Sequence, residues 1–314
     1  MATLPRASVR LPALPRVRQR DWRLAVALLA LVLSASLVTW SDGLDWTPDR
    51  MLLVFLAPAL VLRRGARYLR DFVPFAILIF AYAECRGLAH VIAPHPFYRP
   101  QLWLERALFG GIVPAQWLQE HLFHGTTRWY DRVANVFLEL HFIVPPLLAF
   151  ALWMKRRALF FRFAASMVVL SFAAAVAFAA FPAAPPWAAA KAGYLPHVVK
   201  LPQASAADVS SAGLSPHTFS VATVIPGNPY AAIPSLHAGY AFLVFLTVAG
   251  LLLARPGRFR RSLVALCALY PLLQGLAVVY TGNHYVVDIV IGFAFATAAF
   301  VVTNRVWRRL ELPL

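Results

Sequence analysis

Residues 280–288 read Tyr-Thr-Gly-Asn-His-Tyr-Val-Val-Asp, and they open the last long apolar run of the chain. Within this stretch, His284 and Asp288 stand four residues apart. If the run is a helix, the two side chains lie on one face, one turn from each other. A carboxylate in that position accepts one ring N–H of the histidine and leaves the other ring nitrogen basic. Gly282 and Asn283, just before the histidine, are residues that commonly start helices.

A second apolar run opens in the same way. Residues 232–239 read Ala-Ile-Pro-Ser-Leu-His-Ala-Gly, which places Ser235 and His237 at the start of the run. Helix starts present free backbone N–H groups and the positive end of the helix dipole, and both favour a phosphate group. A lone histidine at a membrane surface more often satisfies an ordinary polar contact. Two such histidines, one of them beside a carboxylate inside a membrane span, favour a catalytic site.

The composition of the chain indicates a membrane protein. Of its 314 residues, 61% are hydrophobic and 13% are charged, and the mean hydropathy is +0.66. The expected fold class is therefore all-α, a polytopic bundle of about eight transmembrane helices. The net charge of +16 does not indicate a nucleic-acid partner, because the basic residues cluster at the ends of apolar runs rather than in one patch. Cys85 and Cys267 both lie in apolar runs, so we expect neither a disulfide nor a metal site.

Eight apolar stretches define the expected spans. They are 24–40, a second ending near residue 62, 72–93, 133–153, a fifth ending at residue 181, 231–253, 263–280 and 285–302. Each is close to the roughly 20 residues that a membrane-crossing helix needs. We expect the first to stay as an anchor, because it lacks a convincing cleavage site. Residues 102–123, with aromatic and aliphatic side chains on one side, predict one or two interfacial helices.

The basic residues give an expected orientation. The apolar runs and the basic segments between them divide the chain into a basic tail (1–23), N-terminal transmembrane helices (24–93), a catalytic membrane domain (94–305) and a short tail (306–314). The tails and alternate loops carry 21 of the 29 lysines and arginines, and the opposite loops carry seven. The positive-inside rule then places both termini in the cytoplasm. The apolar runs that begin beside His237 and His284 both start on the extracytoplasmic side.

The chemistry that these residues suit is phosphoryl transfer. Moving a phosphoryl group off a lipid requires a nucleophile, an acid for the leaving oxygen and fixed positive dipoles. His284 fits the nucleophile, with Asp288 orienting its ring, and His237 fits the acid. Ser235 and Asn283, with nearby backbone N–H groups, are the expected contacts of the substrate phosphate.

The two histidine stretches resemble the second and third signature motifs of the type 2 phosphatidic acid phosphatase (PAP2) superfamily. The likeness is closer to its inositol phosphorylceramide synthase-like branch, to which residues 181–187, Phe-Pro-Ala-Ala-Pro-Pro-Trp, are similar as well. The resemblance covers about residues 103–305. It implies a six-helix membrane core, a phosphohistidine intermediate, lipid-phosphate substrates, and no metal or other cofactor. It also implies that His284 is the nucleophile, Asp288 its partner and His237 the acid.

The sequence departs from the common phosphatases of that superfamily at the motif positions where those enzymes have arginine or lysine. Val278 stands six residues before His284, where those enzymes have an arginine. Their first motif, a lysine followed seven residues later by Arg-Pro, is not found, because Lys191 is followed by Val198-Val199. Lys191 is the candidate phosphate-binding cation, since it follows the Pro-Pro-Trp segment on the expected side. A solvated loop lysine is an equal alternative.

Four other polar residues lie inside expected spans. His141, with Glu139 nearby, lies toward the outer end of its span, and it either lines the substrate pocket or makes an internal hydrogen bond. Glu84 and Arg86 are too close along a helix to face each other. They either pair with other spans or line a cavity.

The sequence thus predicts a membrane-embedded enzyme of a bacterial plasma membrane that takes a phosphoryl or phospho-headgroup from a lipid phosphate. A polar alcohol as acceptor makes it a phosphotransferase, as in the inositol-transferring branch. Water as acceptor makes it a phosphatase of phosphatidate or polyprenyl diphosphate. A transporter is the alternative from another class, but the polar residues cluster at one surface and no internal repeat is evident. Nothing in the sequence indicates an oligomeric state.

Overall fold

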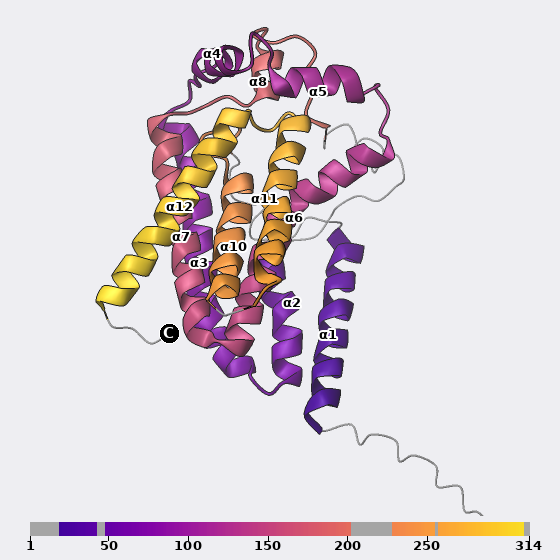
Figure 1. The fold of residues 1–314 in the computed structure, drawn as a ribbon, viewed down its shortest axis with the longest axis vertical. Helices are drawn as coiled ribbons and strands as arrows, with labels where there is room; N and C mark the ends of the chain where they lie inside the picture. Colours follow the sequence, from indigo (N-terminus) through magenta and orange to yellow (C-terminus); the bar gives the residue numbers. More distant parts are fainter. Residues whose placement is uncertain (1–18, 43–47, 202–227, 255–256, 311–314) are drawn as a thin grey trace, which may run out of the picture.

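The computed structural model describes residues 19–42, 48–201, 228–254 and 257–310, and its regular elements in these ranges are helices (Figure 1). In chain order they are α1 (Gln19–Asp42), α2 (Pro48–Val61), α3 (Gly65–Ile92), α4 (Arg99–Leu108), α5 (Pro114–Leu122), α6 (Trp129–Lys155), α7 (Arg157–Ala180), α8 (Pro186–Lys191), α10 (Leu236–Leu253), α11 (Arg260–Tyr280) and α12 (Val286–Arg309). The all-α fold expected from the sequence is confirmed for the described part of the chain.

Within the described ranges, six helices are long and apolar enough to cross a membrane: α3, α6, α7, α10, α11 and α12. They correspond to the last six spans expected from the sequence. The largest differences are at two ends, where α3 begins at Gly65 rather than residue 72 and α12 continues to Arg309 rather than residue 302. Both extensions run into arginine-rich sequence. Arginine is a good helix former, so the backbone hydrogen bonds continue beyond the apolar run.

The first two expected spans are α1 and α2, which pack against each other. The Ser34 hydroxyl of α1 donates to the carbonyl oxygen of Val54 in α2 at 3.0 Å. With 14 residues, α2 is shorter than expected. Its length of about 21 Å falls short of the roughly 30 Å hydrocarbon core. Pro48, a residue that favours the first helical position, sets its start, and Arg63, with a φ of 58°, follows its end.

Three short helices, α4, α5 and α8, lie across one end of the bundle, at the top of Figure 1. The expected interfacial region forms two helices because the chain turns between them at Gly110 and Gly111. These residues have φ values of 61° and 92°, a region that favours glycine. Pro114 then starts α5.

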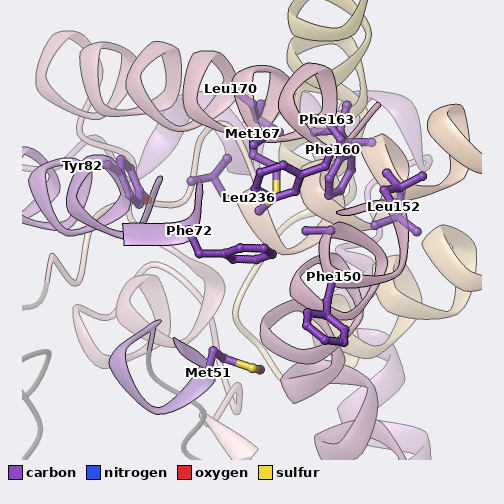
Figure 2. Packing of buried hydrophobic residues seen from close by; sticks show 14 of the residues in the cluster. Met51, Phe72, Tyr82, Phe150, Leu152, Phe160, Phe163, Met167, Leu170 and Leu236 are labelled. Carbon is purple, nitrogen blue, oxygen red and sulfur yellow. The ribbon is translucent and has the colours of Figure 1, made fainter. Parts of the chain in front are cut away.

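A buried cluster joins α2 and α3 to the later helices (Figure 2). The ring of Phe72 in α3 stacks on that of Phe160 in α7, with centroids 4.6 Å apart. Beside it, the carboxylate of Asp71 accepts hydrogen bonds from Trp153 Nε1 at 2.9 Å and from Arg157 Nε at 2.6 Å. These contacts give α3 and the later helices one common core. The division of the chain at residue 94 stays a prediction.

Candidate active site

His237 lies in the first turn of α10. Ser235 is the N-cap of this helix, and its hydroxyl oxygen accepts a hydrogen bond from the backbone N–H of Ala238 at 3.3 Å. The cap fixes where the helix begins and therefore the direction in which His237 projects. Ser235 is fully buried. Its role in the structure is the cap, and its contact with a phosphate oxygen stays a prediction.

His284 lies in the turn between α11 and α12, two residues before α12 begins at Val286. The spacing of His284 and Asp288 predicts that both are helical, but His284 precedes the helix. Gly282 in this turn has a φ of 76°, and a Cβ there would lie 2.7 Å from the carbonyl oxygen of Val199. The turn also brings the backbone N–H of His284 to the carbonyl oxygen of Val278 at 3.1 Å. Only glycine fits this turn without strain.

Asp288 faces His284 although only the aspartate is helical. Its Oδ2 accepts the backbone N–H of Tyr285, the N-cap of α12, at 2.9 Å and lies 3.3 Å from His284 Nδ1. The capping bond turns the carboxylate back toward the residue that precedes the helix. A carboxylate accepts hydrogen bonds, so Nδ1 of His284 carries the ring proton and Nε2 keeps its lone pair.

The two histidines contact each other directly. His237 Nδ1 lies 3.0 Å from His284 Nε2, so Asp288, His284 and His237 form one hydrogen-bonded chain. His284 is 3% exposed and Asp288 is fully buried. Electrostatic interactions among them are therefore stronger than they would be in water.

A cavity of about 310 Å³ lies beside this chain, and His141, His237 and His284 are among its lining residues. The ring centroids of His141 and His237 are 4.1 Å apart. His141 Nδ1 also bonds to the carbonyl oxygen of Leu138. A carbonyl only accepts, so Nδ1 of His141 carries the proton and its Nε2 is a hydrogen-bond acceptor. His141 thus both lines the cavity and makes an internal hydrogen bond.

Lys191 and Asn283 are not among the residues that line this cavity. Lys191 is exposed at the end of α8. The side-chain amide of Asn283 donates to the hydroxyl oxygen of Thr281 at 2.9 Å and so stabilises the turn before His284. Their contacts with substrate stay predictions.

Arg86 of α3 lines the cavity together with the three histidines. Among the described residues, its Nε is buried without a hydrogen-bond partner. The sequence left Arg86 open between pairing with another span and lining a cavity, and its position inside an apolar run was the available signal.

Glu105 of α4 is a residue whose place sequence reasoning missed. It is fully buried, and its Oε1 accepts the backbone N–H of Val287 at 2.9 Å. Burial raises the pKa of the Glu105 carboxyl to about 7, and the Asp288 carboxylate adds to the rise. This bond holds α4 against the N-terminus of α12, and it offsets part of the rise in pKa because the N–H group stabilises the charged form. No sequence spacing connects Glu105 to Val287, so no local pattern could have revealed it.

The Pro-Pro-Trp segment packs against the histidine turn. The backbone N–H of Trp187 donates to the carbonyl oxygen of Gly282 at 3.1 Å. Nζ of Lys200 lies 5.4 Å from the centre of the Trp187 ring, close enough for a cation–π contact. Burial lowers the pKa of Lys200. Lys200 thus places a partly desolvated cation beside the Pro-Pro-Trp segment.

A helical membrane bundle with a buried carboxylate–histidine–histidine chain at one end defines a membrane-embedded, phosphatase-like protein. The chain belongs to the PAP2 superfamily, whose family model matches residues 102–302. It is also 29% identical over 215 residues to the phosphoinositol dihydroceramide synthase of Bacteroides thetaiotaomicron. That match covers 62% of this chain and 62% of the relative, so the chain spans less than two thirds of the relative's length. No solved structure matches the chain. The resemblance drawn from the histidine motifs is confirmed.

Proposed function

We propose that this protein is a lipid phosphotransferase that works through a phosphohistidine intermediate. The observation that carries the proposal is the hydrogen-bonded chain in which His284 Nδ1 faces Asp288 and His284 Nε2 faces His237. It provides a nucleophile with a fixed tautomer and an acid–base group within reach of the same phosphorus atom.

In the first half-reaction, the lone pair on His284 Nε2 attacks the phosphorus of the lipid phosphate. The bond between phosphorus and the leaving oxygen breaks as the new P–N bond forms. His237, protonated on both ring nitrogens for this step, donates one proton to the leaving oxygen and becomes neutral. Asp288 balances the positive charge that develops on the His284 ring.

In the second half-reaction, the oxygen of an acceptor hydroxyl attacks the same phosphorus. Neutral His237 removes the hydroxyl proton, the P–N bond breaks, and His284 recovers its lone pair. The site then holds the protons with which it started. An alcohol in this role completes a transfer, and water completes a hydrolysis.

Substrate binding has to separate the two rings. His237 Nδ1 and His284 Nε2 are 3.0 Å apart, so no phosphorus atom fits between them. The His237 ring, which is half-buried and lines the cavity, is the one with room to turn. The entering phosphate replaces the bond between the histidines with bonds to its own oxygens.

The name of the bacterial relative specifies a phosphoinositol group and dihydroceramide. We therefore propose a phospho-headgroup as the group transferred and a lipid alcohol as the acceptor. Hydrolysis of phosphatidate or a polyprenyl diphosphate is the second candidate, because the same two half-reactions accept water.

The proposed location is a bacterial plasma membrane, with both termini in the cytoplasm and the histidines at the extracytoplasmic face. The excess of basic residues in alternate loops supports it. Two variants, His95→Cys and Leu310→Cys, each made in a background without Cys85 and Cys267, test the orientation. A membrane-impermeant thiol reagent applied to intact cells should label position 95 and leave position 310 unlabelled. The reverse pattern contradicts this orientation.

The function is tested with the full-length protein purified in detergent containing EDTA. A phosphoinositol-carrying lipid serves as donor and dihydroceramide as acceptor, with phosphatidate alone as the comparison. We expect turnover in EDTA, a labelled phospho-group bound to the protein when acceptor is omitted, and loss of both in His284→Ala. His95→Ala, which removes an exposed histidine, is the matched control and should keep activity. Turnover that requires added divalent metal, or that persists in His284→Ala, contradicts the mechanism.

The acceptor is decided in the same assay. Formation of dihydroceramide that carries the phosphoinositol group, only when dihydroceramide is added, supports the transferase. Release of inorganic phosphate from phosphatidate without any alcohol supports the phosphatase.

A further inference from the structure

The cavity beside the histidines extends along one face of α3. Each turn of this helix from Tyr68 to Arg86 contributes at least one lining residue. These two residues are 18 positions apart, which corresponds to about 27 Å along a helix. This length approaches the roughly 30 Å thickness of the hydrocarbon core of a membrane. The cavity therefore has the depth of a lipid chain rather than of a soluble metabolite.

The cavity is polar at one end only. Its ionisable lining groups other than tyrosines are Arg86 and the three histidines of the proposed catalytic site. Farther along α3 the lining side chains are aromatic or aliphatic, among them Phe72, Phe75 and Ile79. At the far end, the Tyr68 hydroxyl already donates to the carbonyl oxygen of Leu52 at 2.9 Å. A cavity with this distribution fits an amphiphile that has one anionic end and a hydrocarbon chain.

Arg86 is the cation suited to the anionic end. It is the one lysine or arginine among the lining residues of this cavity, and its Nε is buried without a hydrogen-bond partner among the described residues. A guanidinium group presents several donors in a fork that matches phosphate oxygens. Its unused donor and its place beside the histidines give it capacity to hold a phosphate group there.

We propose that α3 forms the lipid-binding half of the site. Arg86 holds the phosphate beside His284, and the apolar part of the cavity along α3 and α6 takes one hydrocarbon chain of the lipid. This inference rests on the proposed function for the identity of the reacting group. It goes further in assigning substrate recognition to a helix that precedes the matched family region, which begins at residue 102.

The head-group half is tested by binding, measured by native mass spectrometry on full-length protein that carries His284→Ala to prevent turnover. The probes are long-chain phosphatidate and the diacylglycerol with the same chains. In this background, Arg86→Gln should weaken phosphatidate binding about tenfold or more, because a charge-assisted bond is lost, and leave diacylglycerol binding unchanged. Arg86→Lys should restore part of the affinity. Arg132→Gln, at an exposed arginine of α6 outside the cavity, is the matched control and should bind both probes normally.

The chain half is tested with two alanines of α3. Ala76 lines the cavity, whereas Ala81 is exposed and does not line it. Ala76→Phe should fill the apolar part and weaken binding of long-chain phosphatidate about tenfold, while short-chain phosphatidate binds as before. Ala81→Phe, the matched control, should change neither.

Four outcomes overturn the inference: equal loss of both probes in Arg86→Gln, no loss in that variant, equal loss of long and short chains in Ala76→Phe, or no loss there. The readout is independent of turnover. Selective binding in the His284→Ala background, with no transfer or hydrolysis by the protein that keeps His284, would reject the proposed function and leave this inference standing. Turnover with unselective binding would do the opposite.

Discussion

The backbone N–H of Ser235 donates a hydrogen bond to the carbonyl oxygen of Asp288 at 3.0 Å. This bond joins the N-cap of the helix that carries His237 to the first turn of the helix whose carboxylate faces His284. One turn farther along α12 is Gly292, where a Cβ would come within 2.4 Å of the Ser235 carbonyl oxygen. The absence of a side chain at position 292 is therefore a condition for the contact between the two histidines.

Gly292→Ala is expected to separate the starts of α10 and α12. The new methyl group meets backbone rather than a flexible side chain, so we expect a loss of about 1–3 kcal/mol in stability. Turnover should fall by more than the loss of thermal stability explains, because His237 moves away from His284. Gly250→Ala in α10 is the control, since a Cβ there has no neighbour within 4 Å. Its stability should stay constant or rise by up to about 1 kcal/mol. Equal activity in the two variants would contradict this account of Gly292.

Asp288→Asn tests the tautomer of His284. An amide keeps the size of the carboxylate but has a single oxygen. The same Oδ2 of Asp288 faces His284 Nδ1 and accepts the Tyr285 N–H, so an amide nitrogen placed there also gives up the cap on Tyr285. The lone pair of the histidine would then lie on the wrong nitrogen, and turnover should fall by up to about 10⁴-fold. The thermal midpoint, measured alongside, should change far less than the rate. A variant with nearly normal turnover would show that Asp288 does not orient the nucleophile.

Glu105→Gln should change how stability depends on pH. The folded protein raises the pKa of this carboxyl from 4.5 to about 7, so it holds the proton more tightly than the unfolded chain. Wild-type stability should therefore fall as pH rises from about 4.5 to about 7, and this contribution should be constant above that range. Glutamine keeps the acceptor for the Val287 N–H and does not titrate. Thermal midpoints measured across this range should fall less in the variant, and identical slopes would contradict the assignment.

Gln119→Ala should loosen the end of the bundle that covers the histidines. The side-chain amide of Gln119 donates to the carbonyl oxygens of Tyr280 and Val199 at 2.8 and 2.9 Å and accepts the Val199 N–H at 2.9 Å. Each buried group left unpaired costs about 1–3 kcal/mol, so the thermal midpoint should drop clearly. Gln116→Ala on the same helix removes only an exposed bond to Glu120 and should have little effect. Similar midpoints for the two variants would show that Gln119 is not a structural tie.

Much of the fold could be predicted because the signals are local. Apolar runs and the arginines that bound them located the six helices that can cross a membrane, and Gly110 and Gly111 lie where the interfacial region turns. The start of α12 was less predictable. The cap formed by Tyr285 and Asp288 begins the helix after His284, whereas the four-residue spacing suggested that both side chains were helical.

The sequence by itself determined that the chain is a helical membrane protein and that His237, His284 and Asp288 are candidates for one site. Those properties follow from hydrophobicity, charge and short spacings, which are fixed along the chain. Only the tertiary structure decided that Arg86, 198 positions before His284, lies beside the histidines, and that Glu105 caps α12. Which faces of distant helices meet depends on packing across the whole bundle, and no local spacing encodes that choice.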